Sequence, residues 1–123
     1  MQKDSTFSII NQTKRPQPRG PFLKLKEKVL GKSYELSLVF VGKATSHKLN
    51  ALYRDKDKPT NVLSFPLSKT SGEIFIDLSF TDHSVIFLFI HGLLHLKGMQ
   101  HGATMEREEK KLLAHVQTLR HRN

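Results

Sequence analysis

Residues 91–101 read His91-Gly92-Leu93-Leu94-His95-Leu96-Lys97-Gly98-Met99-Gln100-His101, with histidines at positions i, i+4 and i+10. The segment that leads into this stretch, Val85–Leu96, is otherwise almost entirely apolar. A helix over this segment would be apolar on nearly every face, which is typical of a helix buried in the core of a fold. We therefore predict a buried helix that carries the first two histidines.

The spacing of the three histidines predicts a metal site. Residues four apart lie on one helix face, so His91 and His95 can both reach one ion through bonds of about 2.0–2.1 Å. Gly98 can adopt the left-handed conformation that ends a helix, which lets the chain turn back and bring in His101. Three protein ligands with an open fourth position are typical of catalytic zinc sites, whereas structural sites have four. A lone buried histidine is more often a hydrogen-bonded core residue, but three at this spacing favour a metal.

The pattern resembles the zincin signature His-Glu-x-x-His, in which the glutamate is the general base of peptide hydrolysis. This chain has Gly92 at the position of that glutamate. A peptidase mechanism of the zincin type therefore lacks its base. Glu73 and Asp77 could replace it only if the fold brings them near the histidines, and they are more simply read as solvated residues of a strand.

The remaining sequence predicts an α+β fold. Alternating and β-branched runs predict strands at residues 6–10, 34–41, 61–65 and 73–77, the last two being antiparallel neighbours through a loop at residues 66–72. Helical periodicity predicts helices at residues 21–30, 44–53, 85–96 and 103–119. With 123 residues and no visible linker or repeat, we expect one domain, residues 1–123, with a small mixed sheet packed by helices.

The composition favours a nucleic-acid partner. The formal net charge is +9 and the sequence pI is about 10.0, so the surface should attract polyanions, although most of the lysines taken singly could be ordinary solvated residues. The chain has no cysteine, which excludes disulfides and thiolate ligands. We find no secretory signal and no apolar run long enough to span a bilayer, so we expect a cytoplasmic protein without membrane contact.

Three blocks of the sequence resemble one known family. They are His-Gly-x-Leu-His-Leu-x-Gly followed by His101, then Leu49-Asn50-Ala51-Leu52-Tyr53-Arg54 with Asp57-Lys58-Pro59-Thr60-Asn61-Val62-Leu63-Ser64-Phe65-Pro66, and Gly72-Glu73-Ile74-Phe75-Ile76. In this order they are similar to the motifs of the YbeY family, bacterial metal-dependent endoribonucleases implicated in rRNA maturation. Looser similarity extends over nearly the whole chain.

The resemblance implies a function. It implies a zinc-dependent endoribonuclease for single-stranded RNA that acts in rRNA maturation and ribosome quality control, with one Zn²⁺ per chain held by His91, His95 and His101. Cleavage of the phosphodiester would use a metal-bound water and an arginine. The resemblance also implies the small ribosomal subunit and a ribosome-assembly GTPase as partners.

Arg54 is the arginine that the resemblance assigns to the catalytic site. Its planar guanidinium is permanently charged and can bind a phosphate through two hydrogen bonds while it stabilises charge in the transition state. The alternative is a surface ion pair with Asp55 or Asp57. We expect the catalytic set to be Arg54, His91, His95 and His101.

Two departures from the family favour another function. Gln100 stands where the family usually has an aspartate, and the connection between Ile76 and His91 is short. An amide carries no charge with which to make a metal ligand more basic. The alternative is therefore a catalytically weakened or inactive protein that binds rRNA or the ribosome and retains the metal site. A metal-dependent hydrolase of another substrate, such as a peptide, is disfavoured by Gly92 and the basic surface.

Overall fold

The computed structural model describes residues 6–53, 61–79 and 84–120. Strands and helices are distributed along the chain as predicted, and the α+β fold is confirmed. In order along the chain, the elements are β1 (Phe7–Asn11), α1 (Phe22–Leu30), β2 (Glu35–Val41), α2 (Lys43–Tyr53), β3 (Val62–Ser68), β4 (Ser71–Asp77), α3 (Val85–Leu96) and α4 (Ala103–Arg120).

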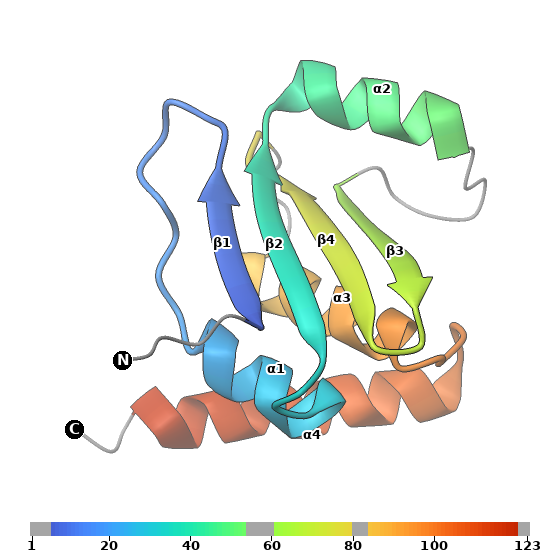
Figure 1. Cartoon of the computed structure of the whole chain (residues 1–123). Coiled ribbons are helices and arrows are strands. Elements are labelled where there is room, and N and C mark those ends of the chain that lie inside the picture. Colours follow the sequence, from blue (N-terminus) through green and yellow to red (C-terminus); the bar gives the residue numbers. More distant parts are fainter. Residues whose placement is uncertain (1–5, 54–60, 80–83, 121–123) are drawn as a thin grey trace.

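The four strands form one mixed sheet in the order β1-β2-β4-β3 (Figure 1). β1 pairs with β2 and β2 with β4 in parallel, whereas β3 is antiparallel to β4. The predicted antiparallel pair is therefore confirmed, and β3 is an edge strand. Its outer edge lies on the side of the sheet where α3 leads into α4 (Figure 1).

The loop predicted at residues 66–72 is wrong, because β3 continues to Ser68 and β4 begins at Ser71. Proline cannot donate a backbone hydrogen bond to a neighbouring strand and is therefore rare in the interior of a sheet. An edge strand needs donors on one side only and therefore tolerates proline. The register shifts between Pro66 and Ser68, which accommodates the ring next to the turn.

Helix α3 is central to the core, with the bounds predicted from the sequence. Its N-terminus is capped by Ser84, whose hydroxyl accepts a 3.0 Å hydrogen bond from the backbone N–H of Phe87. The helix contacts β3, β4, α1 and α4. Its fully buried residues Phe89, Ile90 and Leu93 share one core with residues of β2 and β4, including Leu38, Phe40, Ile74 and Ile76.

The helices cover the two faces of the sheet unequally. α1, α3 and α4 lie on one side, whereas α2 runs across the end of the sheet near the tips of β2 and β4 (Figure 1). Among residues 6–53, 61–79 and 84–120, no helix combines the length and apolar character that a membrane span requires.

Candidate metal centre

The C-terminal end of α3 turns back as predicted at Gly98. This residue has φ of 106°, and its N–H donates to the carbonyl of His95 over 2.9 Å. The N–H of Met99 donates to the carbonyl of Leu94 over 3.0 Å. These two hydrogen bonds are those of a Schellman motif, which satisfies the last carbonyls of a helix and reverses the chain. The reversal brings His101 back beside α3.

The three histidines converge at this reversal. One ring nitrogen from each of His91, His95 and His101 lies within 4.8 Å of the others. The Nε2 atoms of His91 and His95 are 3.2 Å apart. Two nitrogens bound to one tetrahedral ion through bonds of 2.0–2.1 Å would be about 3.3 Å apart. The three side chains therefore fit a single metal ion, and imidazole ligands suit zinc and several other transition metals.

The opposite nitrogens of the first two rings are engaged by the protein. Nδ1 of His91 lies 2.7 Å from Oε2 of Glu109 on α4, and Nδ1 of His95 lies 3.1 Å from the backbone carbonyl oxygen of Met99. Each acceptor favours the tautomer with the proton on Nδ1, which leaves the Nε2 lone pair for the centre of the cluster. Two such lone pairs at 3.2 Å require a proton or a cation between them.

The site is open to solvent on one side. His91 and His95 are half-buried, whereas His101 is exposed. A cavity of about 150 Å³ adjoins the cluster and is lined by Phe87, His91, His101, Gly102, Met105, Glu106 and Glu109. A ligand in solution can therefore approach the histidines from the α4 side.

Position 92 has a structural reason to be glycine. A Cβ atom there would lie 3.0 Å from Ser64 Oγ and 3.0 Å from Ile74 Cγ2, so this side of α3 packs directly against β3 and β4. A glutamate at position 92 would point into the sheet. The sequence prediction that the chain has no zincin base at this position is explained by the packing.

Glu109 was missed by the sequence analysis, although the sequence contains a signal for it. The buried residues of α4 include Met105, Leu112 and Val116, which are spaced as one helix face. Glu109 lies within that apolar stripe and is only 8% exposed. A charged residue on the core side of an amphipathic helix needs a partner, and here the partner is His91.

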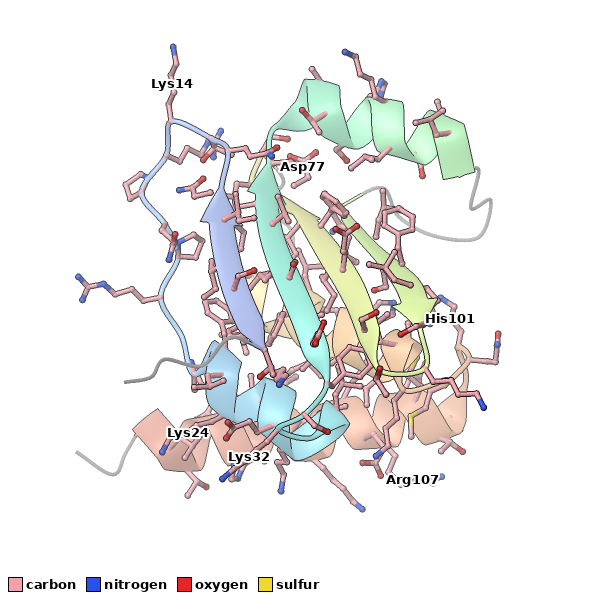
Figure 2. The ribbon with its side chains drawn as sticks, viewed as in Figure 1. Lys14, Lys24, Lys32, Asp77, His101 and Arg107 are labelled. Atoms are coloured by element: carbon pink, nitrogen blue, oxygen red, sulfur yellow. The ribbon has the colours of Figure 1, made fainter. Side chains whose placement is uncertain are left out.

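Asp77 lies away from the histidines. It is near one end of the sheet and His101 is near the other (Figure 2). Its carboxylate accepts hydrogen bonds from the backbone N–H and the hydroxyl of Ser79, over 2.8 and 2.6 Å. Asp77 thus stabilises the turn after β4, and it is not a solvated strand residue, since it is 3% exposed.

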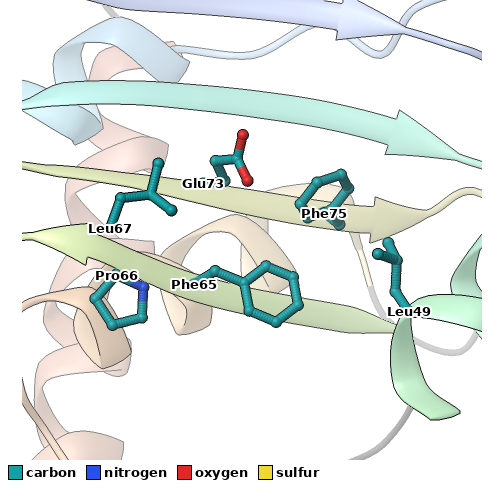
Figure 3. A pocket seen from close by; sticks show the side chains of 6 residues that line it. All are labelled: Leu49, Phe65, Pro66, Leu67, Glu73 and Phe75. Atoms are coloured by element: carbon teal, nitrogen blue, oxygen red, sulfur yellow. The ribbon is translucent and has the colours of Figure 1, made fainter. Parts of the chain in front are cut away.

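Glu73 lies on the sheet face opposite α3. As predicted, its strand alternates, with Ile74 and Ile76 buried in the core. Glu73 lines a separate groove of about 360 Å³ with Leu49, Phe65, Pro66, Leu67 and Phe75 (Figure 3). This groove shares no lining residue with the cavity at the histidines. Glu73 is therefore not placed to act as a base there.

The remaining predicted site residue, Arg54, lies outside the described residues, as do His83 and His121. His47 is exposed on α2 and His115 is half-buried on α4. Among the basic side chains, Lys14 projects from the connection after β1, Lys24 from α1, Lys32 from the turn after α1 and Arg107 from α4 (Figure 2).

Comparison with known proteins agrees with the motifs. The family model described as Endoribonuclease YbeY matches residues 18–122. A protein of that name from Rhizobium etli is 38% identical, over 83% of this chain and 70% of its own length. One from Rubrobacter xylanophilus is 42% identical, over 61% of this chain and 58% of its own length. One from Onion yellows phytoplasma is 37% identical, over 65% of each.

The similarity covers only part of the length of these relatives. The chain spans between 58% and 70% of the length of these three relatives. The match to the family model nevertheless includes all three motif blocks, with His91, His95 and His101. The chain belongs to the YbeY family.

Proposed function

We propose that this chain is a zinc-dependent endoribonuclease that cleaves single-stranded RNA in rRNA maturation and ribosome quality control. The observation that carries the proposal is the convergence of His91, His95 and His101 within 4.8 Å beside an open cavity. The relatives named Endoribonuclease YbeY support RNA as the substrate. The net charge of +9 supports a polyanionic ligand.

Different side chains of the chain would bind the metal, bind the phosphate and attract the RNA. A divalent ion held by the three imidazoles would supply Lewis-acid activation of the phosphoryl group and a nucleophile at neutral pH. His91 and His95 present their Nε2 atoms from one rigid helix, and His101 closes the set from the loop. Arg54 would bind the phosphate through two hydrogen bonds and stabilise its developing charge. The surface lysines would attract RNA without regard to its sequence.

The proposed partners follow from this substrate. A protein that matures rRNA would act in the cytoplasm and contact the small ribosomal subunit, with a ribosome-assembly GTPase as a further partner. Sucrose-gradient sedimentation of the chain with purified small subunits at low and high salt tests the first contact. Co-migration that is lost when excess rRNA is added is expected, and migration at the top of the gradient at every salt concentration would contradict it.

Cleavage of labelled RNA tests the activity. A 5′-labelled single-stranded rRNA fragment, the same fragment in a duplex and a labelled peptide are incubated with zinc-loaded wild type, His95→Ala and Arg54→Ala. We expect the wild type to cleave the single strand and leave the peptide intact. His95→Ala should abolish cleavage, and Arg54→Ala should lower the rate by about 10²–10³-fold.

The same cleavage assay distinguishes the proposed nuclease from the alternative, a weakened or inactive protein that binds rRNA. The exposed Gln100 brings no charge to the site and favours a weakened or inactive protein that binds rRNA. Tight RNA binding without cleavage by zinc-loaded wild type would establish that alternative. Cleavage by His95→Ala at the wild-type rate would contradict a role of the histidines in catalysis and point to a contaminating nuclease.

A further inference from the structure

The apolar stripe of α4 contains one carboxylate. Met105, Leu112 and Val116 are buried along this helix, and Glu109 lies among them at 8% exposure. Burial of an ionised carboxylate is unfavourable unless it is paired and hydrogen-bonded. Its neighbour Glu108, in contrast, is more exposed, with its side chain 35% accessible, and its Oε2 atom lies 3.5 Å from Nζ of the exposed Lys111 in an ion pair.

The partner of Glu109 is a predicted metal ligand. The Oε2 atom of Glu109 lies 2.7 Å from Nδ1 of His91. The side chains of Glu109 and His91 are 10% and 13% exposed, respectively. This separation is typical of hydrogen bonds in which at least one partner is charged. The contact orients the imidazole ring so that its Nε2 atom is directed at His95, 3.2 Å away.

We propose that Glu109 is the positioning residue of the metal site, a carboxylate that holds His91 in its ligating tautomer and makes its Nε2 a better donor. This inference rests on the proposed metal-dependent function. Ligating histidines commonly donate their second N–H to a carboxylate, which fixes the ring and raises the basicity of the ligand. In this chain the carboxylate comes from α4, whereas Gln100, next to the third histidine, is an exposed amide.

The two helical histidines are supported differently. Nδ1 of His95 meets the neutral backbone carbonyl of Met99 at 3.1 Å, a group that side-chain substitution does not remove. Nδ1 of His91 meets a charged side chain from another helix. Substitution at position 109 should therefore weaken the contribution of His91 selectively, and it should link metal binding to the docking of α4 on α3.

Zinc affinity of matched variants tests the proposal. Glu109→Ala removes the acceptor and the charge, and Glu109→Gln removes the charge but keeps the size of the side chain and an amide oxygen for the N–H of His91. Glu108→Gln removes the same charge from the adjacent surface position. Dissociation constants are measured by competition with a chelator of known zinc affinity, on protein whose folding is checked by its zinc-free unfolding midpoint.

We expect Glu109→Ala to weaken zinc binding by about 10–100-fold, Glu109→Gln by less, and Glu108→Gln by less than about twofold. The ¹⁵N chemical shifts of the His91 ring in zinc-free protein give a readout that a merely structural role would not change. They should show the Nδ1-protonated tautomer in the wild type and in Glu108→Gln, and a mixture of tautomers in Glu109→Ala.

Two outcomes would overturn the proposal, and they can be told apart. If wild type binds zinc and folded Glu109→Gln and Glu109→Ala bind it equally well, Glu109 does not position the ligand. If wild type and His91→Ala both fail to bind zinc, the proposed metal-dependent function fails, and this inference fails with it.

Discussion

The hydroxyl of Ser64 on β3 donates a 3.2 Å hydrogen bond to the backbone carbonyl of Gly92 in the middle of α3. A helix carbonyl can be reached by a strand side chain only where the helix lies very close to the sheet. The absent side chain of Gly92 allows this approach, because a Cβ atom would lie 3.0 Å from both Ser64 and Ile74. This close contact determines how far α3, which carries His91 and His95, lies from the sheet.

Gly92→Ala should therefore destabilise the fold. The added Cβ would lie 3.0 Å from Ile74 and Ser64, so these neighbours must shift by a few tenths of an ångström. Such overpacking typically costs about 1–3 kcal/mol, which outweighs the gain of up to about 1 kcal/mol that alanine has over glycine inside a helix. Urea unfolding of zinc-free protein measures the change. Gly42→Ala is the matched control, since a Cβ atom at that position has no neighbour within 4 Å. Equal stability of the two variants would show that α3 does not pack as described.

Gly98→Ala should weaken metal binding as well as stability. Its φ of 106° is strained for any residue with a side chain, and relaxation of that strain would move the carbonyl of Met99 and the backbone leading to His101. We expect a loss of about 1–3 kcal/mol in stability and of about tenfold in zinc affinity.

Gly31→Ala is the control for this experiment. Gly31 has φ of 96° at the end of α1, so alanine is strained there too, but the position is not part of the metal site. This variant should lose stability and bind zinc like the wild type. An unchanged zinc affinity in Gly98→Ala would mean that the turn after α3 does not position the ligands.

Tyr34→Phe should leave stability at neutral pH unchanged or raise it by up to about 1 kcal/mol. Tyr34 is 7% exposed, and its hydroxyl has no hydrogen-bond partner within the described part of the chain. A buried hydroxyl without a partner is unfavourable, so its removal is not costly. Destabilisation of Tyr34→Phe by more than about 1 kcal/mol in urea unfolding would contradict this account of the Tyr34 hydroxyl.

The stability of wild type and of Tyr34→Phe should also depend differently on pH. Burial raises the pKa of Tyr34 above its ordinary value of 10.0, because the ionised form is poorly solvated in the core. Ionisation of Tyr34 therefore does not affect the free energy of unfolding below the unfolded-state pKa, and it lowers that free energy as pH rises toward the higher folded-state pKa. Wild type should therefore lose more stability than Tyr34→Phe as pH rises above about 10. Parallel losses would contradict a raised pKa.

Local patterns predicted α3 and its histidines because both depend on short-range spacing. An unbroken apolar segment identifies a buried helix, and a glycine after it identifies the end. Strand β3 was predicted too short, because Pro66 ends a strand in the interior of a sheet but not at its edge, and sequence alone does not show which strand is at the edge.

Glu109 shows why the outer contacts of the site were not predicted. It lies 18 residues after His91, and its contact depends on how α4 is rotated about its axis against α3. Three glutamates stand in the first turns of that helix, and only their burial distinguishes Glu109 from Glu106 and Glu108. The apolar stripe that contains Glu109 was the available signal.

The metal content of the purified protein tests the central claim most directly. Wild type, His95→Ala and the control His47→Ala, in which an exposed histidine of α2 is removed, are purified without added metal, then supplied with zinc, dialysed and measured by elemental mass spectrometry. We predict about one zinc ion per chain in wild type and His47→Ala and almost none in His95→Ala, as expected for a single site with three protein ligands. Equal and negligible zinc in all three proteins would contradict the claim.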